Sequence, residues 1–354
     1  MSATQPKIMI YGANGYTGNL IAHLAKEQKL NTVLAGRNAN AVNQMGESLG
    51  FACQVFGLDN IDEVVNQLKD IALVIHCAGP FSATAKPMMQ ACLQSQTHYT
   101  DITGEISVFE LAHSLSKQAK QANVILCPGV GFDVIPTDCL ASQLKEKMPD
   151  ATHLAMAFDS AGKMSPGTAK TSVEGLATGG KIRKDGKIIK VPLAYKSKKI
   201  DFGQGEKHAI TIPWGDVATA YYSTGIPNVE IYLPISPGRA KQMKRMNWFR
   251  WIFKLGFVQN RLKQNMAKAS KGPDDEQRKT LKTLLWGEAR NAKGETITSR
   301  LETANGYELT AHGALLMAKH ILDSKVDGGY YTPSLLAGNK IVHQITGSGE
   351  TVFK

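Results

Sequence analysis

Lys7-Ile8-Met9-Ile10-Tyr11-Gly12-Ala13-Asn14-Gly15-Tyr16-Thr17-Gly18 places a short apolar run directly before a turn that contains three glycines. The apolar run predicts a buried parallel strand. Apolar residues at helical spacing follow over 20–24 and predict a helix. The stretch therefore has the order strand, glycine turn, helix, and the rest of the chain is organised around it.

In this order, the three glycines predict a dinucleotide-binding site. Gly12 permits a sharp turn, Gly15 permits backbone N–H groups to approach a pyrophosphate, and Gly18 permits close packing of helix on strand. The helix N-terminus adds a partial positive charge for the phosphates. The alternative is an ordinary tight turn between a strand and a helix.

The end of the second predicted strand indicates which dinucleotide binds. Residues 32–35 are followed by Gly36-Arg37-Asn38, so no acid stands where an NAD site holds the ribose 2′-hydroxyl. Arg37 offers a planar donor fork suited to a 2′-phosphate. The sequence therefore favours NADP(H) over NAD(H), and a solvated Arg37 is the alternative.

Strand and helix patterns then alternate as far as residue 127, which predicts a doubly wound parallel sheet of the Rossmann type. We expect Asp59 near the adenine, and the small turn at 78–81 beside the point where strand order reverses. His76 precedes this turn and is either a core histidine or an acid–base group. We predict strands at 52–56, 72–77, 98–102 and 124–127, and helices at 39–50, 61–69, 84–95 and 106–121.

The loop at 128–138 contains two glycines and two prolines and leaves another predicted strand end. Asp133 either orients a substrate or caps the next helix. For Asp138, capping or matching the helix dipole is the better explanation.

Beyond residue 150 the pattern changes to short strands and hairpins, with a turn signal at Asp185-Gly186. We predict an NADP-binding domain over 1–150 and an α+β domain with a mixed or antiparallel sheet over 151–305. We expect a helix and tail over 306–354 to return to the first domain. A length of 354 residues agrees with two domains.

The composition bounds the class of protein. Apolar content of 43% and charge of 20% are typical of globular proteins. The five cysteines show no metal-binding spacing, so we expect neither disulfides nor a metal. No apolar run is long enough to cross a bilayer and no secretory signal precedes residue 7, so we expect a cytoplasmic protein.

Nearly all of the net charge of +11 comes from one segment. Residues 239–272 contain ten Lys/Arg and no acid, and the remaining chain has 31 basic against 30 acidic residues. This distribution argues against a nucleic-acid-binding body. Trp248 and Trp251 lie within the segment, and apolar residues at 248, 251, 252, 255, 258 and 262 predict a helical stripe. Such a helix would lie on an anionic membrane, dock an acidic carrier, roof a substrate channel or pack on its own domain.

Together these motifs resemble the saccharopine dehydrogenase-like oxidoreductases, a family that includes the trans-acting enoyl reductases. The resemblance implies an NADP(H)-binding Rossmann domain and a second mixed-sheet domain that often supports a homodimer. It does not imply saccharopine as substrate, because the central domain shows no cluster of arginines that would bind a dicarboxylate, and Arg183 there is isolated. The matching stretches are 12–18, 34–37, 77–81, 99–105, 131–136, 213–216, 223–227 and 285–289.

Two functions follow as hypotheses. The first is an NADPH-dependent reductase of a C=C or C=N bond in an apolar or carrier-bound substrate, with Asp133, Thr168 and Lys170 as candidate proton donors. The second is a non-catalytic nucleotide-binding protein attached to a membrane or a partner through 239–272. The expected cofactor-binding residues are Gly12, Asn14, Gly15, Tyr16, Thr17, Gly18, Arg37, Asn38, Asp59, Ala78, Gly79, Pro80, Phe81, Gly104 and Phe132.

Overall fold

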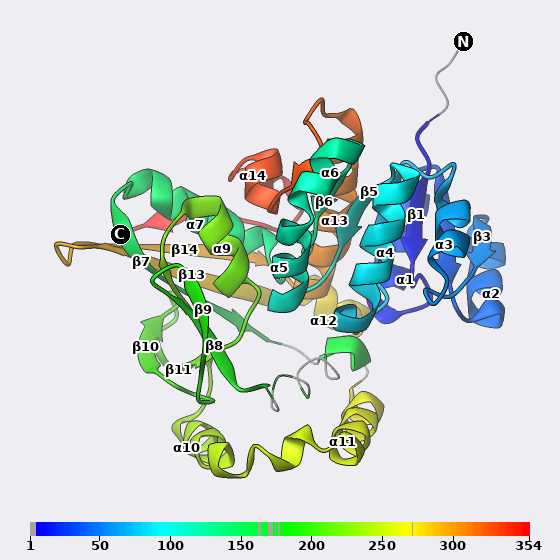
Figure 1. Ribbon diagram of the computed structural model, residues 1–354. Helices are drawn as coiled ribbons and strands as arrows, with labels where there is room; N and C mark the ends of the chain where they lie inside the picture. The colour runs from blue at the N-terminus through cyan, green and yellow to red at the C-terminus, as the bar shows by residue number, and fades with distance from the viewer. Residues whose placement is uncertain (1–4, 162–163, 169–172, 174, 176–177, 271) are drawn as a thin grey trace. The chain divides into compact units, whose positions relative to one another are not determined.

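The computed structural model describes residues 5–161, 164–168, 173, 175, 178–270 and 272–354. The chain divides into two compact units (Figure 1). The first unit contains residues 1–135 and 307–338, and the second contains 136–306 and 339–354. These divisions differ from the predicted boundaries at 150 and 305, and 339–354 groups with the second unit rather than the first.

The first unit is built on a seven-stranded parallel sheet in the order β15-β6-β5-β4-β1-β2-β3. Strand order reverses between β1 and β4, as in Rossmann folds, so the doubly wound prediction is confirmed. Strands β1, β2 and β4 are fully buried, which explains their nearly continuous apolar sequence. The strands are β1 (Ile8–Tyr11), β2 (Thr32–Gly36), β3 (Ala52–Val55), β4 (Leu73–His76), β5 (His98–Asp101), β6 (Ile125–Cys127) and β15 (Gly329–Tyr330).

Helices connect these strands, and right-handed crossovers on either side of the reversal place helices on both faces of the sheet. The helices are α1 (Tyr16–Glu27), α2 (Ala39–Leu49), α3 (Ile61–Leu68), α4 (Phe81–Ser95), α5 (Ile106–Ser114), α6 (Ser116–Ala122), α13 (Gly306–Asp323) and α14 (Pro333–Ala337).

Two predicted helices of this unit are corrected. The helix expected over 106–121 breaks at Leu115, where the Ser114 hydroxyl donates to Leu111 O (2.6 Å) and competes with the helical ladder. The helix expected over 84–95 begins earlier, at Phe81, because the Glu105 carboxylate accepts from the Phe81 and Ser82 N–H groups (2.9 and 2.8 Å).

The second unit has a nine-stranded mixed sheet in the order β10-β11-β12-β7-β13-β14-β16, with the β8–β9 hairpin attached to β12. Among the described strands of this second sheet, only β12 and β7 pair in parallel. The strands are β7 (Ala151–Ser160), β8 (Gly180–Lys184), β9 (Lys187–Val191), β10 (Ser197–Asp201), β11 (Glu206–Ile212), β12 (Asn228–Pro234), β13 (Lys282–Asn291), β14 (Thr296–Ala304) and β16 (Val352–Phe353).

The predicted hairpin turn joins β8 to β9 with positive φ at both Asp185 (49°) and Gly186 (77°). Buried Tyr232 and Trp286 anchor an apolar cluster on the sheet. The helices are α7 (Ile135–Lys147), α9 (Asp216–Thr224), α10 (Pro237–Met246), α11 (Gly256–Ala269) and α12 (Asp275–Thr280), with 3-10 turns at Asn247–Phe249, Ile252–Lys254 and Ile341–Gln344.

Within the part of the chain that the structure describes, no helix is both long and apolar enough to cross a membrane.

Candidate cofactor site

The glycine turn after β1 is packed too tightly for side chains at two of its three glycines. Gly12 has φ +83°, and a Cβ on it would lie 2.8 Å from the Ala78 backbone nitrogen. A Cβ on Gly18 would lie 2.4 Å from Gly12 O. At Gly15, φ is −76° and the nearest atom to an added Cβ, Gly12 O, is 3.2 Å away. Gly12 and Gly18 are therefore required by the fold, whereas a Cβ at Gly15 needs its neighbour to shift by only a few tenths of an ångström.

The N-terminus of α1 differs from those of the neighbouring helices. Asn38 caps α2 through Ala41 N (3.1 Å), Asn60 caps α3 through Asp62 and Glu63, and Glu105 closes the first turn of α4. Helix α1 begins after Gly15, which has no side chain to cap it. Its first-turn N–H groups and dipole suit a pyrophosphate. The turn and helix start at 12–18, which we call the glycine cradle, therefore fit the predicted dinucleotide. The predicted contacts Tyr16 and Thr17 lie in this first turn, and the Tyr16 ring packs edge-on against Tyr307 of α13.

The residues expected at the adenosine end follow β2 and β3. Arg37 is exposed and makes no hydrogen bond or ion pair with the described residues, so its guanidinium is available to a ligand. Asn38 has its side-chain oxygen committed to the α2 cap. Asn14 lies over Gly36, where an added Cβ would be 3.2 Å from Asn14 Oδ1. Burial raises the pKa of Tyr11 to about 12; the Arg37 charge lowers it and the Asp59 charge raises it.

The turn after β4 contains the predicted residues Ala78, Gly79, Pro80 and Phe81, and the Gly79–Pro80 peptide bond is cis. The Thr84 hydroxyl donates to Ala78 O (2.7 Å) and contacts His76 Nε2 (3.0 Å), so it accepts from an Nε2–H tautomer. His76 is fully buried, and burial lowers its pKa to about 3. It is therefore a neutral core residue that supports the turn rather than an acid–base group.

Asp101, at the end of β5, joins two of the predicted loops. Its Oδ1 accepts from Thr103 N (3.0 Å) and Gly129 N (2.8 Å), and its Oδ2 accepts from the Tyr99 hydroxyl (2.6 Å). Burial raises the pKa of Asp101 to about 6, although these hydrogen bonds favour its ionised form. Sequence reasoning did not select Asp101, and an acid that ends an otherwise buried strand is the signal that would have found it.

The loops after β5 and β6 come together at the carboxyl edge of the sheet, where Gly104 lies against Asp133, next to Phe132. A Cβ on Gly104 would lie 2.7 Å from Asp133 Oδ2, so any larger residue at 104 would displace the Asp133 carboxyl. The Phe132 N–H donates to Thr310 Oγ1 of α13 (3.0 Å), which fixes the loop. Burial raises the pKa of Asp133 to about 7. The arrangement therefore holds a carboxyl that is partly protonated at neutral pH. Thr310 was not predicted, because it lies 178 positions from Phe132 in the sequence.

Of the remaining residues singled out in the sequence, Thr168 and Asp138 belong to the second unit. The Thr168 N–H donates to Ser165 Oγ (3.3 Å). Lys170 lies outside the described residues. Asp138 is in the first turn of α7, as predicted for dipole matching.

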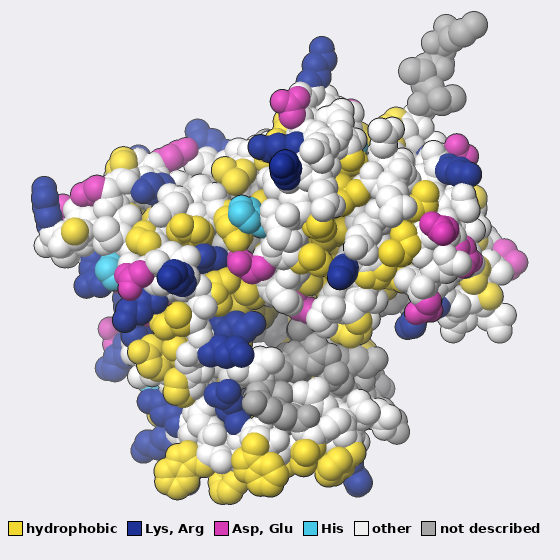
Figure 2. All heavy atoms as spheres, in the orientation of Figure 1, with side chains coloured by type: hydrophobic (Ala, Val, Ile, Leu, Met, Phe, Trp, Pro, Cys, Tyr) yellow, Lys and Arg dark blue, Asp and Glu magenta, His cyan; other side chains and the backbone are white. Residues whose placement is uncertain are grey.

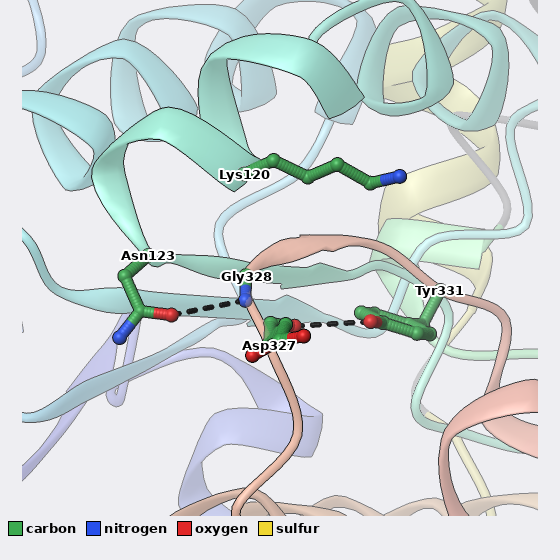
Figure 3. A pocket seen from close by; sticks show the side chains of 5 residues that line it. All are labelled: Lys120, Asn123, Asp327, Gly328 and Tyr331. Carbon is green, nitrogen blue, oxygen red and sulfur yellow. Dashed lines mark hydrogen bonds between the residues drawn. The ribbon is translucent and has the colours of Figure 1, made fainter.

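Figure 3 shows a surface pocket at the opposite end of the first sheet. Asn123 and Gly328 precede β6 and β15, and Asn123 Oδ1 accepts from Gly328 N (3.1 Å). The Tyr331 hydroxyl donates to Asp327 O (3.0 Å) in the same place. Dinucleotides bind at the carboxyl ends of parallel strands, so this amino-end pocket is not the predicted site. Its lining residues are Lys120, Asn123, Asp327, Gly328 and Tyr331.

The fold and the glycine cradle define the first unit as a Rossmann-type dinucleotide-binding domain. Residues 8–127 match the family model described as the saccharopine dehydrogenase NADP binding domain. This match identifies that region as an NADP-binding domain and confirms the resemblance to saccharopine dehydrogenase-like oxidoreductases.

Curated relatives agree with this assignment. The chain is 26% identical over 206 residues to a saccharopine dehydrogenase-like oxidoreductase of Mus musculus, covering 50% of this chain and 47% of the relative. It is 31% identical over 152 residues to a trans-acting enoyl reductase of Mycobacterium leprae, covering 40% and 36%. The matched region thus spans about half the length of the mouse relative and about a third of the mycobacterial one.

A solved structure supports the fold across the whole chain. The saccharopine dehydrogenase (L-Glu forming) of Saccharomyces cerevisiae superposes with a TM-score of 0.67 at 12% identity, covering 99% of this chain and all of that chain. At this identity the likeness establishes the fold alone. It confirms the predicted combination of a parallel Rossmann sheet and a second mixed sheet.

Proposed function

We propose that the protein is an NADP(H)-dependent oxidoreductase that reduces a C=C or C=N bond in an apolar or carrier-bound substrate. The observation that carries the proposal is a protonatable carboxyl, Asp133, at the same sheet edge as the NADP-binding turn. The trans-acting enoyl reductase among the relatives supports the choice of bond.

The proposed reduction needs a hydride and a proton. NADPH supplies the hydride when bound, and it leaves as NADP⁺. In our proposal, Asp133 in its protonated form delivers the proton to the atom of the double bond that does not receive the hydride. Because burial brings the pKa of Asp133 to about 7, a much larger fraction of this carboxyl carries a proton to donate at neutral pH than in an ordinary aspartic acid.

The neighbouring residues position this chemistry. Glu105 ties the turn after β5 to the start of α4, and Asp101 ties that turn to the loop after β6. Three strand-end loops are thereby linked by carboxylate hydrogen bonds. Such fixed geometry lowers the entropic cost of bringing hydride donor and acceptor together.

A turnover screen tests the proposal. NADPH oxidation is followed with enoyl-thioesters, imines and quinones, and the reduced product is identified by mass spectrometry. We expect turnover of an enoyl-thioester or an imine. NADPH binding without turnover of any member of the panel would contradict the proposal and favour a non-catalytic nucleotide-binding protein.

A further inference from the structure

The basic segment of the second unit exposes aromatic rings that its own packing does not use. Trp248 is 84% exposed, Trp251 63% and Phe257 73%, and Phe249 beside them is also exposed. The single helix predicted for this region is wrong, since two 3-10 turns separate α10 from α11. Figure 2 shows hydrophobic side chains gathered along the α10–α11 segment at the bottom of the view. We call residues 248–257 the aromatic ridge.

The aromatic ridge is held in place from its inner side. Asn247 Oδ1 accepts from Leu193 N (2.8 Å), and Asn247 Nδ2 donates to Leu193 O (3.1 Å). Arg250 Nη2 donates to Thr178 O (3.4 Å), and a Cβ on Gly179 would lie 2.5 Å from Arg250 Nη1. Arg250 therefore anchors the ridge to the 178–179 segment, whereas the neighbouring rings at 248, 249 and 251 stay exposed.

Exposed cations flank the ridge on both sides. They make no ion pair with the described residues, and no acid occurs between 239 and 272. A second copy of the chain docked symmetrically on this face would place these like charges against each other. The exposed cations with described side chains are Arg239, Lys241, Lys244, Arg245 and Arg261.

We propose that the aromatic ridge and its flanking cations form a docking face for an anionic lipid bilayer. Tryptophan rings combine an apolar body with a polar N–H and prefer the membrane–water interface. Lysine and arginine beside them attract anionic headgroups, and each well-placed cation strengthens binding by about fivefold. An acidic protein partner would satisfy the cations, but it would not need a row of exposed rings.

Co-sedimentation with vesicles tests the proposal independently of NADPH turnover. We expect the full chain to sediment with vesicles of phosphatidylcholine and phosphatidylglycerol at 0.1 M salt, much less with phosphatidylcholine alone, and less at 1 M salt because the Debye length falls from about 10 Å to about 3 Å. Tryptophan emission should shift to the blue on binding, because Trp248 and Trp251 are exposed while Trp286 is already buried.

Matched variants locate the contact. Lys244→Glu with Arg245→Glu should weaken vesicle binding by at least 25-fold. Trp248→Ala with Trp251→Ala should abolish the blue shift and weaken binding. The control pair Lys117→Glu with Lys325→Glu, also exposed but in the first unit, changes the net charge equally and should have little effect.

Four results would overturn the proposal. The first is no sedimentation with anionic vesicles at 0.1 M salt, and the second is equal loss in the control pair. The third is a ridge that mediates self-association, seen as dimers in sedimentation velocity that Trp251→Ala dissociates, without any lipid binding. Capture by polyglutamate without vesicle binding would likewise assign the face to an acidic protein.

Discussion

The carboxyl edge of the first sheet and the aromatic ridge of the second unit are both surfaces suited to a ligand, but they are built in opposite ways. At the sheet edge, glycines permit close backbone contacts, and the Asp101 and Glu105 carboxylates tie neighbouring loops together. At the ridge, the Asn247 side chain anchors a segment that exposes large rings and cations without ion pairs among the described residues. The first arrangement gives a shaped site for one small molecule, whereas the second gives a broad face for an extended partner.

The largest expected effect comes from filling the glycine cradle. Gly18→Val places a side chain where even a Cβ would lie 2.4 Å from Gly12 O, so α1 must move off the sheet. We expect a loss of more than about 3 kcal/mol in the free energy of unfolding, together with loss of NADPH binding. Chemical denaturation followed by circular dichroism measures the first, and a fluorescence titration measures the second.

Gly15→Val is the matched control for the cradle. An added Cβ there has 3.2 Å to its nearest neighbour and φ is −76°, so the variant should fold. It should nevertheless bind NADPH at least 100-fold more weakly, because the side chain occupies the approach of the pyrophosphate. Micromolar NADPH binding by this variant would show that the turn is structural only.

The next effect concerns the proton donor. Asp133 has a pKa of about 7, so its acid form is lost as the pH rises, and the rate of reduction should fall tenfold per pH unit well above 7. Asp133→Asn should lower kcat by about 10²- to 10⁴-fold and remove this dependence. The measurement is kcat from pH 5.5 to 9 with the best substrate of the screen. Thr310→Val, which removes the acceptor for Phe132 N, should lower kcat but keep the pH dependence.

A smaller effect is expected at the adenosine end. Arg37→Ala should weaken NADP(H) binding by roughly 1.5–3 kcal/mol, the contribution of hydrogen bonds to a charged group, and should leave NAD(H) binding nearly unchanged. Calorimetric titration of both cofactors measures the difference. If the unaltered protein binds NAD(H) as tightly as NADP(H), Arg37 is not the specificity residue.

The smallest effect tests whether the two surfaces are independent. Lys244→Glu with Arg245→Glu should leave the dissociation constant for NADPH within about twofold of the unaltered protein, because the glycine cradle and Arg37 belong to the other unit. The same titration measures it. A tenfold weaker affinity for NADPH would mean that the basic segment contributes to cofactor binding and that the two surfaces are not independent.

The sequence by itself determined the features that depend on neighbours along the chain. The strand, glycine turn and helix over 7–27, the β8–β9 hairpin turn and the order of alternating elements follow from local sterics and apolar periodicity, and all appear in the structure. The position of Arg37 directly after β2 is equally local.

Tertiary structure decided the features that depend on contacts between distant residues. Glu105 lengthens α4 from 24 positions away, Thr310 holds Phe132 from 178 away, and burial rather than neighbouring sequence raises the pKa of Asp133. The helix predicted across 248–258 does not form as one α-helix: the backbone leaves the helical region at Leu255 (ψ 123°), and the Asn247 side chain ties the preceding residues to Leu193. The apolar periodicity of the sequence predicts which residues are buried. Only tertiary packing determines which distant groups come into contact and how far water is excluded from them.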